Sequence, residues 1–335
     1  MRVAVIGAGS WGTALASVLA DKGDQVTLWS YEPECAESIN AQNENQLFLP
    51  GITLPPNLRA TTDLGAACEG AQLVVSVTPS HVTRAVFEQL VEHLPEHTPI
   101  VSATKGIENE TLMTISELLE DVLPLRFHPY LAYLSGPSFA REVAQRHPTT
   151  VAVASYSDKL GQLVQNAFHT PYFRAYRTTD VEGVEIGGSL KNVIAIAVGV
   201  ADGMGFGHNS RAALITRGLA EISRLAVKRG ANPLTVAGLA GMGDLVLTCT
   251  GGLSRNRAVG VKLGQGRPIA EILGDMRMVA EGVKTAKSVY DLAESLGVDM
   301  PICREVYRVL YEGKTPAEGL KDLMARELTR ENFGF

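Results

Sequence analysis

The sequence has no uninterrupted apolar stretch long enough to cross a lipid bilayer. The longest such run in its 335 residues is VIAIAVGVA, residues 193–201, whereas a membrane-spanning helix needs about 20 apolar residues. The opening residues, MRVAVIGAGS, have the pattern of a strand and a turn, without the apolar core of a secretion signal. These absences predict a soluble cytoplasmic protein with no stable membrane insertion.

An excess of basic residues is also missing. The formal net charge is -6, so no extended cationic surface for nucleic acid is expected, although a local cationic pocket can still bind a small anion. The four cysteines, Cys35, Cys68, Cys249 and Cys303, form neither a CxxC motif nor the spacing of a metal site. They indicate reduced, packed thiols in a reducing compartment and no metal centre.

Short β-branched segments alternate with helical patterns through the first half of the chain. Strand-like segments occur at VAVIGA, QVTLWS, AQLVVSVTPS, PIVSATKG, YLAYLSGPS, PTTVAVAS and FRAYRTT, and a helix is expected near residues 33–44. This βαβ rhythm predicts a mostly parallel sheet with helices on both faces, ending near Arg177.

Helical patterns replace the strands after residue 180. Helices are expected at about 182–200, 208–229, 233–241, 243–249, 254–264, 281–296, 301–312 and 316–328. A chain of this length suits two domains. We therefore predict an α/β domain over residues 1–184 and an all-α domain over residues 185–335, with the boundary near Val184.

A glycine motif, GxGxxG, follows the first predicted strand and opens the first predicted helix. Gly7 would permit the tight turn, Gly9 the close approach of a pyrophosphate, and Gly12 close packing of the helix, whose N-terminus offers N–H groups to an anion. The alternative is a tight turn without a ligand. Its position at the start of a βαβ unit favours a Rossmann-like dinucleotide-binding domain.

The end of the second strand, WSYEPE, bears on which dinucleotide binds. Glu32 would either contact an adenosine ribose hydroxyl or remain a solvated loop charge. Ser30 and Tyr31 could donate hydrogen bonds to a 2′-phosphate, but no basic residue follows them directly. These residues leave NAD and NADP open.

Small or polar residues follow three later strands, at the edge where open α/β sheets bind ligands. They are Pro79 and Ser80, then Lys105, then Gly136, Ser138 and Ala140 at a helix start. Lys105 is either an exposed loop residue or an ammonium group beside a polar substrate. Ser135 or Ser138 would cap the helix, and Ser138 could line a site as well.

Lys191 stands in the otherwise small or apolar part of the stretch EIGGSLKNVIAIAVG. Gly187 and Gly188 lie about one turn before it, so another backbone or a ligand can approach closely. A buried, unpaired ammonium group costs several kcal/mol or loses its proton, so the position needs an acidic partner or a chemical role. Lys191 either extends past the glycines to solvent or gives and takes a proton, as interconversion of an alcohol and a ketone requires.

The segment GMGDLVLTCTGGLSRNR is a further concentration of polar groups. Asp244 and Thr248 are four residues apart on one helical face, and Arg255 and Asn256 start the next helix. Arg255 would clamp a phosphate together with helix N–H groups, and Arg257 would either share this duty or face water. Asp244 would either cap its helix or orient the ammonium group of Lys191.

A series of segments, in the order in which they occur along the chain, resembles the soluble bacterial-type NAD(P)-dependent sn-glycerol-3-phosphate dehydrogenases. They are GAGSWGTALA, TPSH, SATKGIE, LSGPSFARE, GGSLKNVIAIAVGVADGMGFGHNSRAALITRGLAE, GMGDLVLTCTGGLSRN and VAEG, and they cover nearly the whole chain. The resemblance implies reversible hydride transfer between NADPH or NADH and dihydroxyacetone phosphate, giving sn-glycerol 3-phosphate for glycerophospholipid synthesis. It also implies a homodimer.

The resemblance assigns roles to residues that match the family's motifs. The implied catalytic residues are Lys191, as proton donor and acceptor, Lys105 and Asp244. The implied substrate-binding residues are Lys105, Gly136, Ser138, Lys191, Asn192, Asp244, Thr248, Ser254, Arg255 and Asn256, with the last two on the phosphate. The implied cofactor-binding residues are Gly7, Gly9, Ser10, Trp11, Gly12, Tyr31, Pro79, Lys105, Ala140, Arg255, Val279 and Glu281. Trp11 and Tyr31 stand where the family varies in residue type.

Two other functions fit parts of the sequence. A two-domain dehydrogenase of a β-hydroxy acid or a sugar acid would also use a lysine on its interdomain helix, and its carboxylate substrate would also accept Arg255. A nucleotide sensor without catalysis would need no combination of Lys191, Asp244 and Arg255, so the sequence disfavours it. Rates with dihydroxyacetone phosphate and with hydroxy acids separate these functions.

Overall fold

The computed structural model describes residues 1–276, 280–328, 330 and 331, and the chain separates into two compact units. The first unit contains Met1–Lys105 and Ile115–Val184, and the second contains Gly106–Thr114 and Glu185–Phe335. The short excursion of Gly106–Thr114 into the second unit differs from the sequence-based division, which assigned every residue before 185 to the first.

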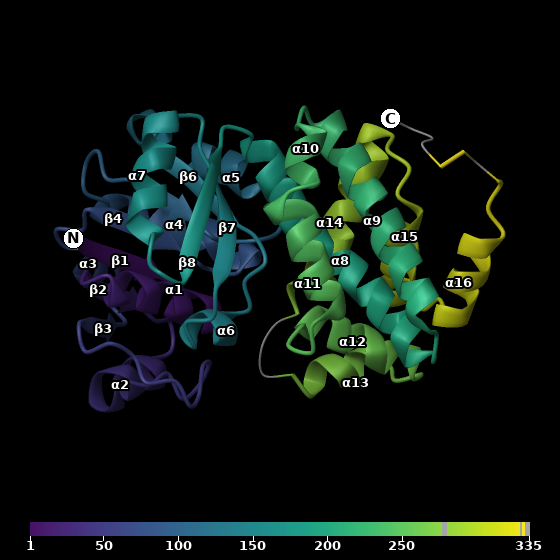
Figure 1. The fold of residues 1–335 in the computed structure, drawn as a ribbon, viewed down its shortest axis with the longest axis horizontal. Coiled ribbons are helices and arrows are strands. Elements are labelled where there is room, and N and C mark those ends of the chain that lie inside the picture. The colour runs from purple at the N-terminus through teal and green to yellow at the C-terminus, as the bar shows by residue number, and fades with distance from the viewer. Residues whose placement is uncertain (277–279, 329, 332–335) are drawn as a thin grey trace. The chain divides into compact units, whose positions relative to one another are not determined.

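An eight-stranded sheet forms the centre of the first unit (Figure 1). Its strands are β1 (Arg2–Ile6), β2 (Gln25–Trp29), β3 (Leu58–Thr61), β4 (Leu73–Ser76), β5 (Ile100–Ser102), β6 (Leu131–Ser135), β7 (Thr149–Ala154) and β8 (Phe173–Thr178). Their order is β3-β2-β1-β4-β5-β6-β7-β8, and β6 and β7 are the antiparallel neighbours in an otherwise parallel sheet. The expected mostly parallel sheet is confirmed, and its strand order reverses at β1 and β4, where ligands bind in such folds.

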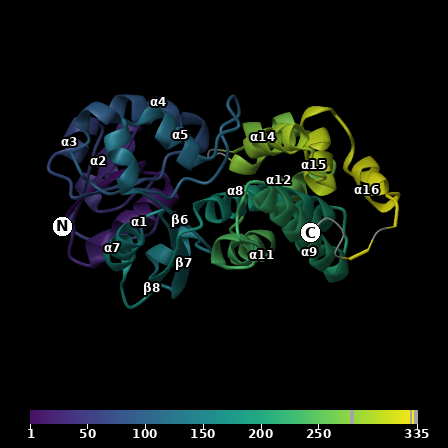
Figure 2. The same cartoon turned by 90° about the horizontal axis from the view of Figure 1, so that it is seen from above.

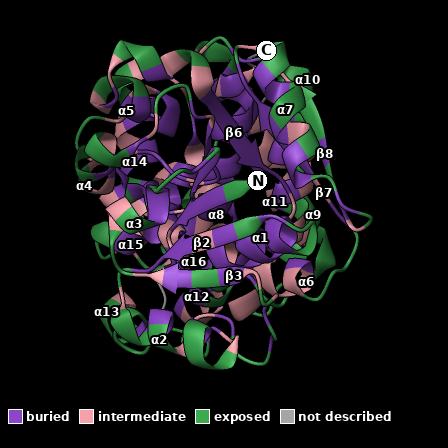
Figure 3. Ribbon diagram, turned by 90° about the vertical axis from the view of Figure 1, so that its left-hand side faces the viewer, coloured by how far each residue is buried: buried purple, intermediate pink, exposed green. Residues whose placement is uncertain are grey.

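Helices cover both faces of this sheet. They are α1 (Ser10–Asp21), α2 (Pro33–Gln42), α3 (Leu64–Cys68), α4 (Ser80–Leu90), α5 (Ile115–Val122), α6 (Ala140–Ala144) and α7 (Asp158–Phe168). On one face α1 contacts α6 and α7, and on the other α4 contacts α3 and α5. Figure 2 shows α1 and α7 apart from α3, α4 and α5. The strands between them are largely buried, as Figure 3 shows, because they consist mainly of β-branched and small apolar residues.

The second unit is built of helices. They are α8 (Val181–Gly203), α9 (His208–Lys228), α10 (Pro233–Val236), α11 (Asp244–Thr250), α12 (Arg255–Gly264), α13 (Ile269–Gly274), α14 (Glu281–Leu296), α15 (Pro301–Tyr311) and α16 (Pro316–Met324). The expected helical second half is confirmed. Some elements differ from expectation: β3 and α13 were not foreseen, and a π-helical turn, Leu239–Gly243, interrupts the helix expected over 233–241.

Two helical segments, Val181–Gly203 and Pro233–Thr250, are long and apolar enough to cross a membrane by length and composition alone. The longest uninterrupted apolar run, residues 193–201, lies within the first of them. In the structure 89% of the apolar window of Val181–Gly203 is buried and 39% of that of Pro233–Thr250. A buried core helix passes the same length test, so the length of α8 by itself does not indicate a membrane span.

A buried carboxylate joins two helices of the second unit. Glu221 on α9 is 1% exposed and accepts hydrogen bonds from the backbone N–H groups of Ile302 at 2.7 Å and Cys303 at 3.1 Å. These N–H groups belong to the first turn of α15, where an α-helix has no partners of its own for them. Burial raises the pKa of Glu221 to about 7, against the lowering effect of the two hydrogen bonds.

The raised pKa of Glu221 makes stability depend on pH. Between pH 4.5 and about 7 the unfolded chain loses this proton while the folded chain keeps it, so the free energy of unfolding falls as pH rises. The shift corresponds to a loss on the order of 3 kcal/mol across this window. Urea denaturation from pH 4.5 to 7.5 should show this fall in the wild type and a shallower one in Glu221→Gln. Equal slopes for the two proteins would contradict the assignment.

Candidate functional site

In the first unit, the turn between β1 and α1 has the geometry that the glycine motif predicts. Gly7 has a φ of 117°, which favours glycine, and a Cβ on Gly12 would lie 1.8 Å from the carbonyl oxygen of Gly7. Among the described residues, no atom lies within 4 Å of where a Cβ on Gly9 would stand, and the buried Nε1 of Trp11 has no hydrogen-bond partner. Open space and a helix N-terminus at one turn fit the pyrophosphate of a dinucleotide.

The segment after α2 is hydrogen-bonded to this turn. Asn45 Nδ2 donates to the carbonyl oxygen of Ala8 and to Thr13 Oγ1, both at 2.8 Å, and Ser10 Oγ donates to the carbonyl oxygen of Phe48 at 2.7 Å. Asn45 is fully buried, so water does not compete for its bonds. Asn45 was not predicted from the sequence, because a single asparagine in a loop carries no pattern that separates it from an ordinary turn residue.

The residues after β2 correct one expectation. Ser30 is fully buried, and its Oγ donates to the carbonyl oxygen of Glu32 at 2.9 Å. The expectation that Ser30 could donate to a 2′-phosphate is therefore wrong. Tyr31 is 79% exposed, and Glu32 precedes the first residue of α2.

Beyond β5 and β6, two side chains meet at one carbonyl group. Lys105 Nζ donates to the carbonyl oxygen of Gly136 at 3.2 Å, and Ser138 Oγ donates to the same oxygen at 2.9 Å. Three residues that the sequence placed at the carboxyl edge of the sheet thus lie together within the first unit. Lys105 is half-buried, so the interpretation of an ordinary exposed loop lysine is wrong.

The remaining predicted residues of this edge lie at helix starts. Pro79 stands at the N-cap position of α4, and Ala140 is the first residue of α6. The N-cap of α6 is Phe139, and no side chain among the described residues caps that helix. The expectation that Ser135 or Ser138 caps it is therefore wrong.

In the second unit, Lys191 lies in the middle of α8 and is 7% exposed. Its Nζ donates to Asp244 Oδ1 at 2.5 Å and to Thr248 Oγ1 at 3.0 Å. Thr248 Oγ1 in turn donates to the carbonyl oxygen of Asp244 at 2.6 Å. The interpretation that Lys191 extends to solvent is wrong, and the expected pairing of its ammonium group with Asp244 is confirmed. Asp244 does not cap α11.

The π-helical turn Leu239–Gly243 brings Asp244 to this position. A Cβ on Gly187, about one turn before Lys191, would lie 2.9 Å from backbone atoms of the turn. A Cβ on Gly241 would lie 1.9 Å from a carbonyl oxygen of α10. Gly187 allows the backbone of the π turn to lie directly on α8, and Gly241 allows the turn to pack closely against α10. This close contact explains why small residues precede Lys191.

Asn192, the neighbour of Lys191, belongs to a chain of buried amides. Asn256 Nδ2 donates to Asn192 Oδ1 at 2.8 Å, and the backbone N–H of Gly282 donates to Asn256 Oδ1 at 3.0 Å. Asn256 therefore joins α12 to α8 and to the start of α14, whose first residue is Glu281. Val279, an expected cofactor-binding residue, lies outside the described residues.

The first turn of α12 carries the predicted phosphate clamp. Ser254 is the N-cap, and its Oγ accepts the backbone N–H of Arg257 at 3.2 Å. Arg255 is the exposed first residue of the helix. Arg257 is not directed at water: its Nε and Nη2 donate to Asp202 Oδ2 at 2.8 Å and 2.7 Å. The expectation that Arg257 faces water is therefore wrong.

The second unit thus combines two kinds of chemistry. Lys191, with Asp244 and Thr248, is a desolvated ammonium group in a fixed orientation, able to give or take a proton at a neighbouring oxygen. Arg255 at a helix N-terminus is suited to bind an anion. Among the described residues, no group of three or more histidines, cysteines or acidic residues could hold a metal ion.

The chain is similar to proteins of known family over its whole length. Residues 2–161 match the model for the NAD-dependent glycerol-3-phosphate dehydrogenase N-terminus, and residues 180–321 match the model for the C-terminus. A glycerol-3-phosphate dehydrogenase [NAD(P)+] of Myxococcus xanthus is 58% identical over 334 residues, covering 100% of both chains. The crystal structure of glycerol-3-phosphate dehydrogenase from Coxiella burnetii has a TM-score of 0.92 at 39% identity, covering 97% of this chain and 99% of that one.

The same likeness extends to a eukaryotic structure. Glycerol-3-phosphate dehydrogenase of Saccharomyces cerevisiae has a TM-score of 0.81 at 32% identity, covering 97% of this chain and 99% of that one.

Removing the carboxylate of Asp244 should strongly destabilise the protein. Asp244→Ala leaves the Lys191 ammonium group buried without its ion-pair partner, which costs about 3–5 kcal/mol of unfolding free energy. The double variant Lys191→Met/Asp244→Ala removes both charges and should recover much of this loss. Chemical denaturation at pH 7 measures the wild type, the single variants Asp244→Ala and Lys191→Met, and the double variant. Simple addition of two losses in the double variant would show that the two groups do not interact.

Proposed function

The chain belongs to the family of NAD(P)-dependent glycerol-3-phosphate dehydrogenases, and we propose that Lys191 and Arg255 carry the proton transfer and the phosphate binding of that reaction. The enzyme is an NAD(P)-dependent oxidoreductase that interconverts dihydroxyacetone phosphate and sn-glycerol 3-phosphate. The observation that carries the proposal is the buried pair of Lys191 and Asp244, whose Nζ and Oδ1 lie 2.5 Å apart. Packing between two helices does not require a buried ion pair, because apolar residues of similar volume would stabilise the contact at least as well.

Proton transfer is assigned to Lys191. The bonds from its Nζ to Asp244 and Thr248 fix the direction of the ammonium group before the substrate arrives. The reduced nicotinamide supplies the hydride when it is bound. In the direction of reduction, Lys191 donates a proton from Nζ to the ketone oxygen of the substrate, and it takes the proton back in the reverse direction. Asp244 stabilises the ammonium form between turnovers.

Phosphate binding is assigned to the first turn of α12. The guanidinium group of Arg255 binds phosphate oxygens with two parallel donors, and the positive end of the helix dipole adds to the attraction. Asn256 and its bonding partner Asn192 line the same region, and Ser254 holds the turn in its helical form. Thr248 supports Lys191.

Substrate contacts are also assigned to Lys105, Gly136 and Ser138. Lys105 is joined by a peptide bond to Gly106, whose N–H donates to Ser189 Oγ at 2.9 Å, two residues before Lys191 on α8. The ammonium group of Lys105 would stabilise negative charge that develops on the ketone oxygen.

The dinucleotide is assigned to the turn of Gly7, Gly9 and Gly12. The residues proposed to line it further are Ser10, Trp11, Tyr31, Pro79, Lys105, Ala140, Arg255 and Glu281. The open position at Gly9 and the unpartnered Trp11 Nε1 support this assignment. The proposal also includes a cytoplasmic homodimer that supplies glycerol 3-phosphate for glycerophospholipid synthesis and can use NADPH or NADH.

Replacing the proposed proton donor should abolish turnover but not cofactor binding. Lys191→Met should lower kcat for dihydroxyacetone phosphate about 100- to 10,000-fold, the range that a general acid contributes. The dissociation constant for NADPH, followed by its fluorescence, should stay unchanged. Lys228→Met, an exposed lysine at the end of α9, serves as the matched control and should retain wild-type rates. Near-normal kcat in Lys191→Met would refute the role.

The substrate class is tested by rates with the wild type. Oxidation of NADPH and of NADH, followed at 340 nm, should be rapid with dihydroxyacetone phosphate. In the reverse direction, reduction of NADP+ and of NAD+ should be negligible with a panel of β-hydroxy acids and sugar acids. Rapid turnover of a hydroxy acid alone would favour the other dehydrogenase class.

A further inference from the structure

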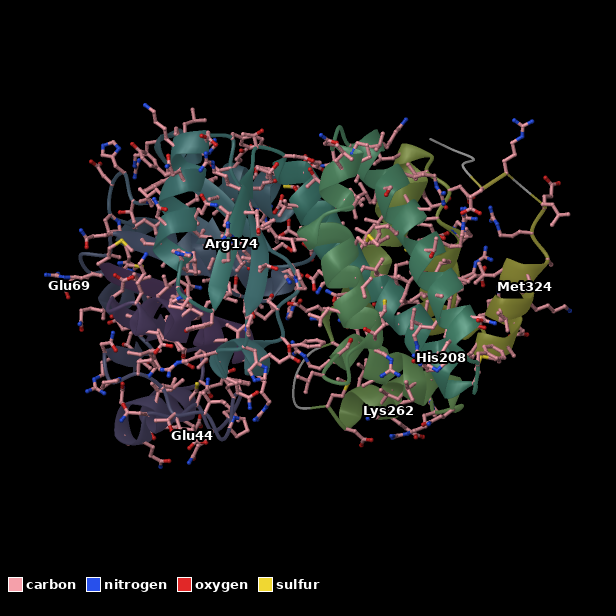
Figure 4. All side chains as sticks on the ribbon, in the orientation of Figure 1. Glu44, Glu69, Arg174, His208, Lys262 and Met324 are labelled. Atoms are coloured by element: carbon pink, nitrogen blue, oxygen red, sulfur yellow. The ribbon has the colours of Figure 1, made fainter. Side chains whose placement is uncertain are left out.

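Asp202, near the end of α8, holds two arginines from two different helices. Its Oδ2 accepts both donors of Arg257 on α12, at 2.8 Å and 2.7 Å. Its Oδ1 accepts Nε and Nη2 of Arg211 on α9, at 3.1 Å and 2.7 Å. The carboxylate is only 8% exposed, so both ion pairs are partly shielded from solvent. Figure 4 labels His208, the first residue of α9, and Lys262, in the last turn of α12, which mark the two helices involved.

Arg257 is held at three groups: its backbone N–H, its guanidinium group and its carbonyl oxygen. Its backbone N–H donates to Ser254 Oγ at 3.2 Å, and its guanidinium group is bound by Asp202. Its carbonyl oxygen lies against α8, since a Cβ on Gly199 would come within 2.2 Å of it. The first turn of α12 is therefore attached to α8 at Arg257.

The same contact continues along both helices. A Cβ on Gly203 would lie 2.2 Å from the carbonyl oxygen of Val261, and a Cβ on Gly260 would lie 2.1 Å from that of Ile196. The backbones of α8 and α12 thus touch directly, without side chains to absorb a shift of one helix against the other. The ion pair of Asp202 and Arg257 lies at the end of this contact where α12 begins.

This contact between α8 and α12 links Lys191, the proposed proton-transfer residue, to Arg255, the proposed phosphate-binding residue. Lys191 and Gly199 lie on the same helix, eight residues or about 12 Å apart. Arg255 precedes Arg257 by two residues on α12. The place where α12 rests on α8 therefore determines how far the guanidinium group of Arg255 stands from the ammonium group of Lys191.

We propose that Arg257, held by Asp202, is a positioning residue that sets the phosphate-binding turn Ser254–Asn256 at the correct distance from Lys191. The proposal rests on the function proposed above. Arg257 does not touch the phosphate in this role. Its removal releases the turn, so phosphate recognition is weakened while the proton-transfer group on α8 stays in place.

The test compares a phosphorylated and an unphosphorylated substrate. In Arg257→Met, KM for dihydroxyacetone phosphate should rise about 10-fold or more while kcat changes less than about 3-fold. The value of kcat/KM for dihydroxyacetone, which has no phosphate, should stay at the wild-type level, and so should KM for NADPH. Asp202→Asn should reproduce this pattern, and Arg257→Lys should recover part of the affinity because it retains a charge for Asp202.

Arg211→Met is the matched control. It breaks an ion pair on the same carboxylate with similar geometry, but Arg211 belongs to α9 and not to the phosphate-binding turn. This variant should keep the wild-type KM for dihydroxyacetone phosphate. An equal rise in KM for Arg211→Met and Arg257→Met would show that the effect comes from general destabilisation of the protein. This result would overturn the proposal.

Two further outcomes are decisive. A uniform loss of rate with both substrates in Arg257→Met, or no change in KM, contradicts the positioning role. If Arg257→Met fails to fold, Asp202→Asn provides the second variant, because it removes the charge that holds the guanidinium group of Arg257 and leaves the backbone contact of α8 and α12 unchanged. It should give the same selective rise in KM. A wild type that reduced both substrates equally well would contradict phosphate recognition itself, which is part of the proposed function.

Discussion

The second unit depends on the placing of one ammonium group in an apolar helix. Lys191 is 7% exposed, and an unpaired charge at that depth would cost more than the packing of α8 could offset. The carboxylate of Asp244 at 2.5 Å removes this cost and at the same time fixes the direction of Nζ. A pair of this kind contributes little to stability compared with well-packed apolar residues, so its presence is better explained by chemistry than by folding.

Two neighbouring elements lie with their backbones directly against α8, the helix that carries Lys191. The π-helical turn rests on α8 at Gly187, and α12 rests on it at Gly199. Side chains at these positions would collide with the backbones of the neighbouring elements, and Asp244 and Arg255 would move with those elements. The small residues of α8 and the buried lysine are therefore two parts of one arrangement, in which a rigid helix positions groups that are far apart in sequence.

The sequence predicted those features that arise from local pattern. The turn at Gly7, the parallel sheet and the helical second half follow from periodicity and from glycine geometry. The energetic need of a buried charge for a partner predicted either an acidic residue beside Lys191 or a chemical role for it, and Asp244 was expected either to orient the ammonium group or to cap its own helix. Features decided by tertiary contacts were missed or misjudged. Asp202 lies 55 residues before its partner Arg257, Asn45 lies 37 residues after Ala8, and nothing local marks either contact.

Other errors have equally specific causes. β3 is only four residues long and has an exposed arginine at its second position, so it shows little of the apolar character of a buried strand. Ser30 looked available because it follows a strand end, but its hydroxyl is bonded to the backbone two residues further on. The entry of Gly106–Thr114 into the second unit depends on bonds such as that from Gly106 to Ser189, which pattern analysis cannot register.

The most direct test of the central claim is a crystal structure of the enzyme with NAD and sn-glycerol 3-phosphate bound. The account predicts that Lys191 Nζ lies within hydrogen-bonding distance of the oxygen on the central carbon of the substrate while it remains bonded to Asp244, with the phosphate on Arg255. A substrate whose central oxygen is bound by other groups, with Lys191 remote from it, would contradict the account.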